Sequence, residues 1–310
     1  MNILPDPLSV GTQAKREEGP VRLCYLILAH RYPHQLLRLV NRLDGAHTAF
    51  LVHLDRKAPE ATSIWLKQQL HQRDNVHFLK RHTCHWGGFG IVRATLEGMQ
   101  YGISEDIPFD HLVLLSGQDY PIKSNIDIRE FFKTHEGVSF IHHNPFPYAE
   151  WVREDGGWDR VRRWHFRRGY LHVRLPVRNG LLSRVPGWRR FPQGYHPFGG
   201  AQFWCMARHH VRQVCDLVSS EPEFVSFFRF ADIPDEIFLQ TIAGNRLARD
   251  ELRSETLTFV EWHRPGATLT IGDFGNLRRT DHLFARKFDL TVDSAVLDRI
   301  DREFLGWEKR

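Results

Sequence analysis

The sequence predicts an α/β protein with a mostly parallel central sheet. Over the first half of the chain, short apolar runs typical of strands alternate with segments whose apolar residues recur at helical spacing. Several of these runs end abruptly in polar residues, as strands do where an open α/β sheet forms its ligand site. This strand–helix–strand rhythm favours right-handed crossovers and a nucleotide-type site at the carboxyl edge of the sheet.

The expected strands cover 21–29, 49–54, 76–79 and 112–115, and the expected helices 35–43, 59–70 and 91–101. Regularity fades after residue 140, where an insertion at about 145–195 is crowded with arginine and aromatic residues. A helix from 210 to about 218 and a strand near 257–262 follow. We expect a single domain over 21–310, preceded by a disordered polar leader at 1–20.

The composition is that of a soluble globular protein, with 42% hydrophobic and 25% charged residues among 310. No apolar run approaches the roughly 20 residues that a membrane span needs, and no signal peptide is recognisable, so we expect a cytoplasmic protein. The four cysteines form no CxxC pair, which argues against a zinc knuckle or a disulfide framework. The net charge of +5 is compatible with nucleic acid, an anionic membrane surface or a phosphate-bearing substrate.

The apolar run 112–115 ends in Ser116-Gly117-Gln118-Asp119-Tyr120-Pro121, so Asp119 stands where such sheets bind ligands. An active-site acid and a turn-capping aspartate explain Asp119 equally well. Asp55 follows the second strand, where acids of dinucleotide folds hold a base or a ribose hydroxyl, and a turn-forming aspartate explains it equally well. No G-x-G-x-x-G and no P-loop is present, which excludes the usual dehydrogenase and kinase signatures.

Two further segments carry candidate chemistry. In Trp86-Gly87-Gly88 the glycines allow a ligand close to the backbone and Trp86 offers a flat surface for a ring, although a core tryptophan beside a tight turn is the alternative. Pro234-Asp235-Glu236 is expected to open a helix, where acids complement the helix dipole. Glu236 precedes apolar residues and is a candidate general base with a raised pKa.

Arg286 and Lys287 lie between aromatic residues and are candidates to neutralise a diphosphate, with a solvated surface pair as the alternative. The chain contains no Asp-x-Asp, the device that holds a metal ion in many nucleotide-sugar enzymes. We therefore expect no catalytic metal and no other cofactor. The histidines near strand ends lack metal-site spacing. A nucleic-acid surface on the arginine-rich insertion lacks any accompanying module motif, and an acceptor-binding or membrane-contacting role is favoured.

Six segments in order form a recognisable series: Leu26–His30, His53–Lys57, Trp86–Gly88, Leu115–Lys123, Pro234–Glu236 and Phe284–Phe288. Together they resemble the core-2/I-branching β-1,6-N-acetylglucosaminyltransferase and peptide O-xylosyltransferase family. The resemblance runs from about Val21 to Phe288. It implies a GT-A-like nucleotide-sugar-binding fold and an inverting, metal-independent transfer from a UDP-sugar, with UDP-GlcNAc favoured and UDP-xylose second.

The resemblance also implies roles for individual residues. Glu236 would be the general base, and Arg286 and Lys287 would neutralise the departing UDP. The residues implied at the donor site are Ala29, Asp55, His85, Trp86, Asp119 and Gln202. Trp262 and, within the insertion, Arg153 are the expected acceptor contacts.

Animal members are membrane-anchored and disulfide-bonded, whereas this chain has no anchor and few cysteines. We therefore expect a bacterial-type enzyme that glycosylates a surface polysaccharide, glycolipid or polypeptide, with peripheral membrane association left open. The alternative from another class is a non-catalytic protein that binds a nucleotide or an anionic glycan.

Overall fold

The computed structural model describes residues 19–168, 171–175, 189–261, 264 and 266–307. Its centre is a seven-stranded sheet in the order β12-β6-β11-β4-β1-β2-β3. These strands are β1 (Leu23–Ala29), β2 (Thr48–Leu54), β3 (Val76–Phe78), β4 (His111–Ser116), β6 (Ser139–Ile141), β11 (Trp204–Ala207) and β12 (Leu252–Arg253). Only β11 runs antiparallel to its neighbours in this sheet.

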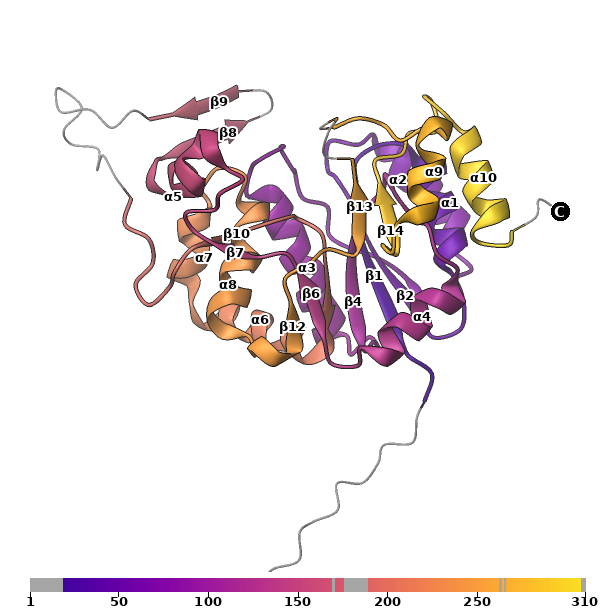
Figure 1. The fold of residues 1–310 in the computed structure, drawn as a ribbon, viewed down its shortest axis with the longest axis horizontal. Helices are drawn as coiled ribbons and strands as arrows, with labels where there is room; N and C mark the ends of the chain where they lie inside the picture. The colour runs from indigo at the N-terminus through magenta and orange to yellow at the C-terminus, as the bar shows by residue number, and fades with distance from the viewer. Residues whose placement is uncertain (1–18, 169–170, 176–188, 262–263, 265, 308–310) are drawn as a thin grey trace, which may run out of the picture.

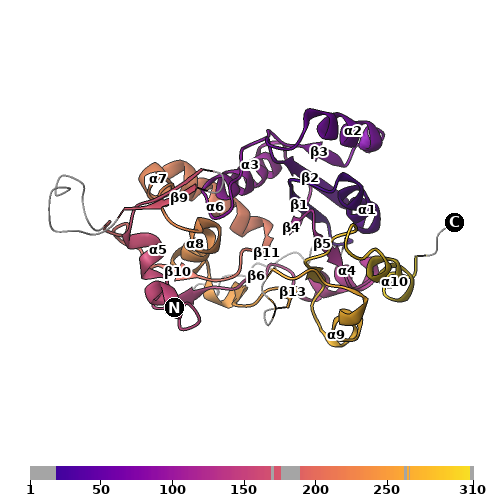
Figure 2. The same ribbon diagram turned by 90° about the horizontal axis from the view of Figure 1, so that it is seen from above.

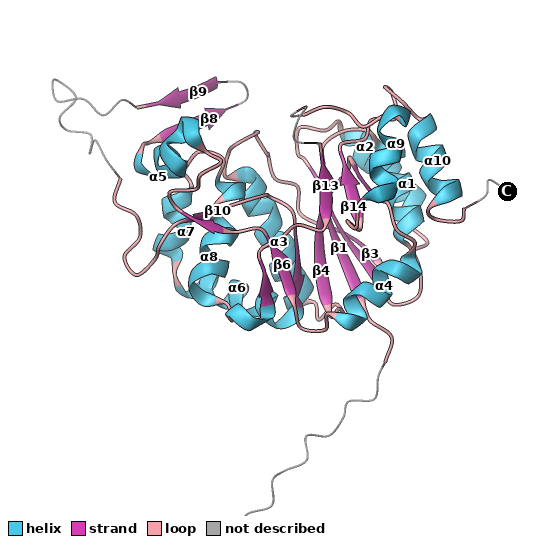
Figure 3. Ribbon diagram, in the orientation of Figure 1, coloured by secondary structure: helices cyan, strands magenta, loops and turns pink. Residues whose placement is uncertain are grey.

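Helices cover both faces of the sheet (Figures 1 and 3). They are α1 (Pro33–Leu43), α2 (Glu60–Leu70), α3 (Gly90–Ser104), α4 (Asn125–Thr134), α6 (Arg208–Ser220), α7 (Pro222–Phe228), α8 (Phe238–Arg246), α9 (Phe274–Arg279) and α10 (Ala295–Glu303). Because side chains alternate along a strand, Tyr25 and Ile27 of β1 pack on the face with α1, α4 and α10, while Cys24 and Leu26 face α3, α6 and α8. The sheet is therefore buried on both sides, which explains its continuous apolar runs.

A second, three-stranded sheet orders β13 (Thr258–Val260), β14 (Phe284–Arg286) and β5 (Asp119–Pro121). Since β5 follows β4 almost directly, this small sheet continues from the carboxyl end of the central strand (Figure 1). Ala285 and Tyr120 pair across it and are both fully buried. The late segment of the chain is thus attached to the middle of the large sheet.

The remaining elements are short. They are β7 (Asn144–Pro145), η1 (Val152–Gly157), α5 (Trp158–Arg162), β8 (His165–Arg168), β9 (Leu171–Arg174), β10 (Phe198–Gly199), η2 (Pro234–Glu236), η3 (Arg249–Glu251) and η4 (Ile271–Asp273). In Figure 2, α5 and β9 lie at the end of the molecule opposite α9 and α10. The arginine-rich insertion thus contains a 3-10 turn, a short helix and the antiparallel β8–β9 hairpin.

The predicted α/β class and the mostly parallel sheet are confirmed, and strands and helices of the first half match within a few residues. Two expectations need correction. The insertion is not wholly irregular, and Pro234–Glu236 forms a separate 3-10 turn that ends at Ile237, before α8 begins at Phe238. Among the described residues, no helix combines the length and apolarity that a bilayer crossing requires.

A buried ionic network ties the C-terminal helix to this core. Asp301 of α10 accepts hydrogen bonds from Arg38 (2.7 Å), Arg42 (2.6 Å) and the hydroxyl of Tyr120 (2.6 Å). Asp301 is 4% exposed, so its charge depends on these three donors rather than on water. Although burial opposes ionisation, the three donors hold the pKa of Asp301 below its usual value.

Replacing Asp301 by Ala should destabilise the protein by about 3–5 kcal/mol, because two arginines and a hydroxyl lose a buried partner. Asp298→Ala is the matched control: its carboxylate also pairs with Arg38 but is 39% exposed, so a cost of about 1 kcal/mol or less is expected. Urea unfolding followed by circular dichroism measures both. Equal losses for the two variants would contradict the structural role of the network.

Candidate active site

The loops that follow β1, β2 and β4 meet at the carboxyl edge of the sheet. The Asp55 amide donates to the carbonyl of Ala29 (2.8 Å), and the Gly117 amide donates to the carbonyl of Leu28 (3.0 Å). A Cβ at Gly117 would approach the Cβ of Ala29 to 3.1 Å, so this close meeting of the loops favours small side chains. Ala29 at the end of β1, Asp55 directly after β2 and Asp119 at the start of β5 therefore share one edge of the sheet, as predicted.

Asp55 organises the loop that leads to Trp86. Its buried carboxylate accepts hydrogen bonds from the amide of Lys57 (2.8 Å) and from the amide of Cys84 (3.3 Å). The ammonium group of Lys57 lies 3.6 Å from the same carboxylate. These contacts hold the segment before Trp86 against the end of β2.

The Trp86 loop joins the early strands to the Pro234–Glu236 turn. The carbonyl of Gly87 accepts a hydrogen bond from the amide of Ile233 (3.0 Å). Gly87 has φ +66°, and a Cβ there would meet Arg167 at 2.8 Å, so glycine is required. The Trp86 side chain is 70% exposed, with the guanidinium of Arg167 4.9 Å from its ring centre. Next to it, Nδ1 of His85 is buried without a hydrogen-bond partner.

Asp119 positions Arg286. Its carboxylate is 0% exposed and accepts hydrogen bonds from the amide (2.7 Å) and hydroxyl (2.8 Å) of Ser116 and from Nε of Arg286 (3.0 Å). Burial raises the pKa of the Asp119 carboxyl, and the Arg286 guanidinium opposes that rise. Since both carboxylate oxygens are engaged behind Arg286, the geometry supports a positioning role rather than a sugar contact.

Two further cations, Lys287 and Arg31, lie near Arg286. Burial and the neighbouring guanidinium groups of Arg31 and Arg286 lower the pKa of the Lys287 amino group. Arg31, from the loop after β1, also donates to the side-chain carbonyl of Gln118 (3.2 Å). Mutually repelling cations at a sheet edge are stabilised by an anion placed among them. Sequence reasoning missed Arg31, whose position directly after a predicted strand was its only signal.

Glu236 is held by a buried arginine. Its carboxylate accepts a hydrogen bond from Nη1 of Arg160 (2.7 Å), whose Nη2 donates to Glu154 (3.0 Å). The Arg160 guanidinium stacks 3.6 Å from the ring centre of Trp151. Burial raises the pKa of Glu236, Arg160 opposes the rise, and the side chain remains 32% exposed. Arg160 was noted in the sequence only as one of many arginines in the insertion.

The segment 199–203 connects the acid to the cations. The Gly200 amide donates to the carbonyl of Glu236 (3.0 Å), and the Arg286 guanidinium lies 4.2 Å from the ring centre of Phe203. A Cβ at Gly200 would stand 1.8 Å from the carbonyl oxygen of His142, so no other residue fits there. In the sequence, Gln202 lies between Gly200 and Phe203, the two residues that make these contacts. The resemblance implies that Gln202 contacts the donor sugar, which stays a prediction.

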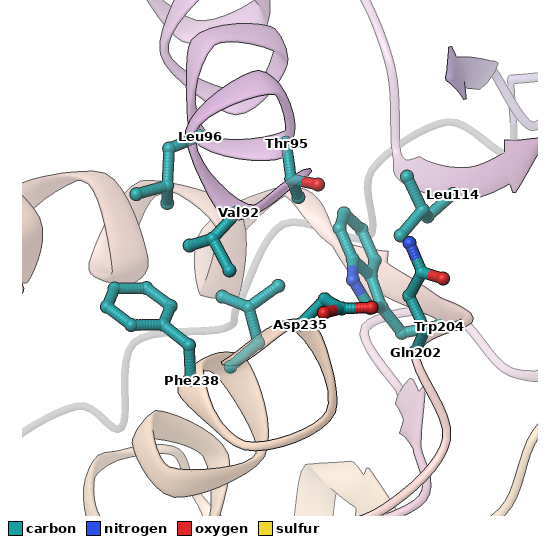
Figure 4. A pocket seen from close by; sticks show the side chains of 9 residues that line it. Val92, Thr95, Leu96, Leu114, Gln202, Trp204, Asp235 and Phe238 are labelled. Carbon is teal, nitrogen blue, oxygen red and sulfur yellow. The ribbon is translucent and has the colours of Figure 1, made fainter. Parts of the chain in front are cut away.

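A small pocket adjoins this segment (Figure 4). Apolar side chains from α3, α8, β4 and β11 line most of it, and Thr95, Gln202 and Asp235 contribute polar groups. The Asp235 carboxylate points toward Trp204 and Gln202, and its Oδ1 has no hydrogen-bond partner. Burial and the charge of Glu236 raise the pKa of Asp235 to about 7. Asp235, which the sequence explained by the helix dipole, is thus part of the site.

Of the two predicted acceptor contacts, the structure describes only Arg153. Arg153 is exposed in η1, next to Glu154. Trp262 lies outside the described residues. The other predicted residues fall into two connected groups, one around Asp119, Arg286 and Lys287 and one around Glu236.

The family model described as "Core-2/I-Branching enzyme" matches residues 23–279. The chain is 25% identical to xylosyltransferase 1 of Homo sapiens over 93% of its own length, and 25% identical to xylosyltransferase 2 of Canis lupus familiaris over 96%. It spans only 31% and 35% of these relatives. Among solved structures, galactosyltransferase LgtC in complex with donor and acceptor sugar analogs aligns with a TM-score of 0.43 and 11% identity, over 93% of this chain and 98% of that one. Because the family model covers most of its length, the chain belongs to the Core-2/I-branching enzyme family.

Proposed function

We propose that the protein is an inverting glycosyltransferase that moves a sugar from UDP to an acceptor hydroxyl. One observation carries this proposal: the segment 199–203 contacts both Glu236, an accessible carboxylate, and Arg286. Arg286 belongs to a cluster of cations with Arg31 and Lys287. A displacement at an anomeric carbon needs a base on the attacking side and positive charge on the leaving side. Membership of the family supports the same reaction class.

In the proposed mechanism, Glu236 takes the proton of an acceptor hydroxyl as that oxygen attacks the anomeric carbon. The bond from this carbon to the diphosphate oxygen breaks, and its electron pair leaves with UDP. Arg286 and Lys287 meet the charge that develops on the leaving diphosphate. Because Asp119 holds Arg286 in place beforehand, little reorganisation is needed during the reaction.

Arg160 has a separate role in this scheme. Its hydrogen bond orients Glu236, while its charge favours the ionised carboxylate and so opposes the rise in pKa that burial causes. A general base works best with a pKa close to the working pH, and the rise in the pKa of Glu236 above its ordinary value is in that direction.

The donor and acceptor are proposals at a finer level. UDP-GlcNAc follows from the resemblance, and the relatives named xylosyltransferases support UDP-xylose as the second donor to test. For the acceptor we propose a hydroxyl of a surface glycan or polysaccharide. The exposed Arg153 is available to contact it.

Replacing Glu236 by Gln should lower kcat by about 10²- to 10⁴-fold, because the general base is lost. The affinity for UDP should change little, since Glu236 lies on the acceptor side. UDP release measures turnover, and calorimetry measures UDP binding. Glu223→Gln, an exposed acid of α7, is the control. Turnover of Glu236→Gln within a few-fold of wild type would remove Glu236 as the base.

Replacing Arg286 or Lys287 by Met should lower kcat by about 10²- to 10³-fold, as loss of a preorganised charge does in other enzymes. Lys57→Met, a half-exposed cation at the same edge, should have a much smaller effect. In this scheme no metal ion assists the leaving group, so turnover should persist in excess chelator. A complete loss in chelator that added metal reverses would contradict the cation-cluster mechanism.

The pH dependence of kcat provides a third test. Glu154 raises the pKa of Glu236, so Glu154→Gln should lower it. A base with a lower pKa stays ionised to lower pH, and the acid limb of the kcat profile should therefore move to lower pH. If the acid limb stays in place or moves to higher pH, the group that titrates on this limb is not Glu236.

A further inference from the structure

Within the part of the chain that the structure describes, two groups of side chains bring together three candidate metal ligands. The first is His165, His172 and Asp232, beside the β8–β9 hairpin. Here Nε of Arg167 already donates to the Asp232 carboxylate (2.7 Å), so a cation would have to displace a guanidinium. The second is His209, His210 and Glu251, at the opposite edge of the sheet from the candidate active site.

The second group has the spacing of a metal site. Nε2 of His209 lies 2.9 Å from a carboxylate oxygen of Glu251, and Nε2 of His210 lies 3.4 Å from the same oxygen. A tetrahedral zinc ion with bonds of about 2.0–2.1 Å separates its ligand atoms by roughly 3.3 Å. Small side-chain adjustments would therefore suffice to place one ion among the three.

His210 supplies the second observation. Its side chain is 0% exposed, yet its Nε2 has no hydrogen-bond partner, because the approach to Glu251 lacks hydrogen-bond geometry. Its other nitrogen, Nδ1, lies 2.8 Å from the hydroxyl of Ser139, which also accepts a hydrogen bond from the Ala207 amide (2.9 Å). If Nδ1–H donates to Ser139, Nε2 carries a lone pair, and a carboxylate oxygen lies only 3.4 Å from it. Two acceptors this close to each other call for a cation between them.

The geometry points to a divalent-cation site formed by His209, His210 and Glu251, with zinc as the ion that suits two imidazoles and a carboxylate. Water completes the coordination, since His209 and Glu251 are 43% and 45% exposed. The Ser139 hydroxyl, 2.8 Å from Nδ1, orients the His210 ring, as hydrogen bonds to the other ring nitrogen do for metal-binding histidines.

The site would join separate parts of the fold. His209 and His210 begin α6, whereas Glu251 ends η3 and is followed by the edge strand β12 (Figure 1). Ser139 begins β6, between β11 and β12. Ala207, at the end of the antiparallel β11, pairs with His111 at the start of β4, so the cluster lies at the amino edge of the parallel strands. Zinc there would stabilise this edge of the sheet and leave the chemistry at the carboxyl edge unchanged.

The test is a zinc titration of the full chain, stripped of metal with chelator and dialysed. We expect one zinc per chain at this site and a rise in Tm of about 3 to 4 °C at a hundredfold excess over the Kd. His209→Ala and Glu251→Gln, both at half-exposed positions, should each weaken zinc binding at least tenfold and so lower the Tm rise at the same zinc concentration to about half or less. The fold of both variants is checked by their metal-free Tm. Cobalt in place of zinc should give the visible absorption of a four-coordinate ion.

His172→Ala is the matched control, because it removes a ligand of the first group. It should leave the zinc affinity and the Tm rise unchanged. Zinc binding that survives both His209→Ala and Glu251→Gln, or that is lost only in His172→Ala, would overturn the assignment. The readout does not depend on turnover, so the result stands apart from the proposed transferase activity.

Discussion

The ion pair between Asp119 and Arg286 is the contact on which the arrangement of the site depends. It joins the loop after the central strand β4 to a strand that arrives 167 residues later, and it does so inside the small sheet where these two residues are register partners. A fully buried aspartate requires such a partner, because an isolated charge would be expelled from the core. Arg286 is thereby fixed at the carboxyl edge, with Lys287 next to it and Arg31 from the neighbouring loop.

A different contact, the hydrogen bond from Arg160, positions Glu236. Arg160 emerges from the insertion, stacks on Trp151 and binds both Glu236 and Glu154. Through Arg160 the insertion thus holds the proposed base, Glu236, in place. This arginine is buried and is not part of a basic surface. The segment 199–203 contacts both Glu236 and Arg286, and glycine at position 200 permits the close backbone approach. The proposed acid–base side and leaving-group side are consequently linked by one short segment.

Much of the fold was predictable because the physics that sets it is local. The apolar runs of β1, β2 and β4 are long enough to identify as buried strands, and Asp55 and Asp119 follow them directly. The antiparallel direction of β11 was not predictable, since pairing with β4 and β6 depends on distant segments. For the same reason the sequence predicted Asp119 and Arg286 as site residues but not the ion pair between them. Arg160 was passed over because nothing in its local sequence distinguishes it from surface arginines, and Arg31 because its place after a predicted strand was its only signal.

The most direct test of the central claim is UDP release from a panel of UDP-sugars with glycan acceptors, measured in chelator, with Glu236→Gln as the background. For an inverting glycosyltransferase we expect release of UDP from UDP-GlcNAc or UDP-xylose that requires both an acceptor hydroxyl and Glu236. The product should have inverted anomeric configuration. Tight UDP-sugar binding with no release on any acceptor would contradict this expectation and would favour a non-catalytic nucleotide- or glycan-binding protein.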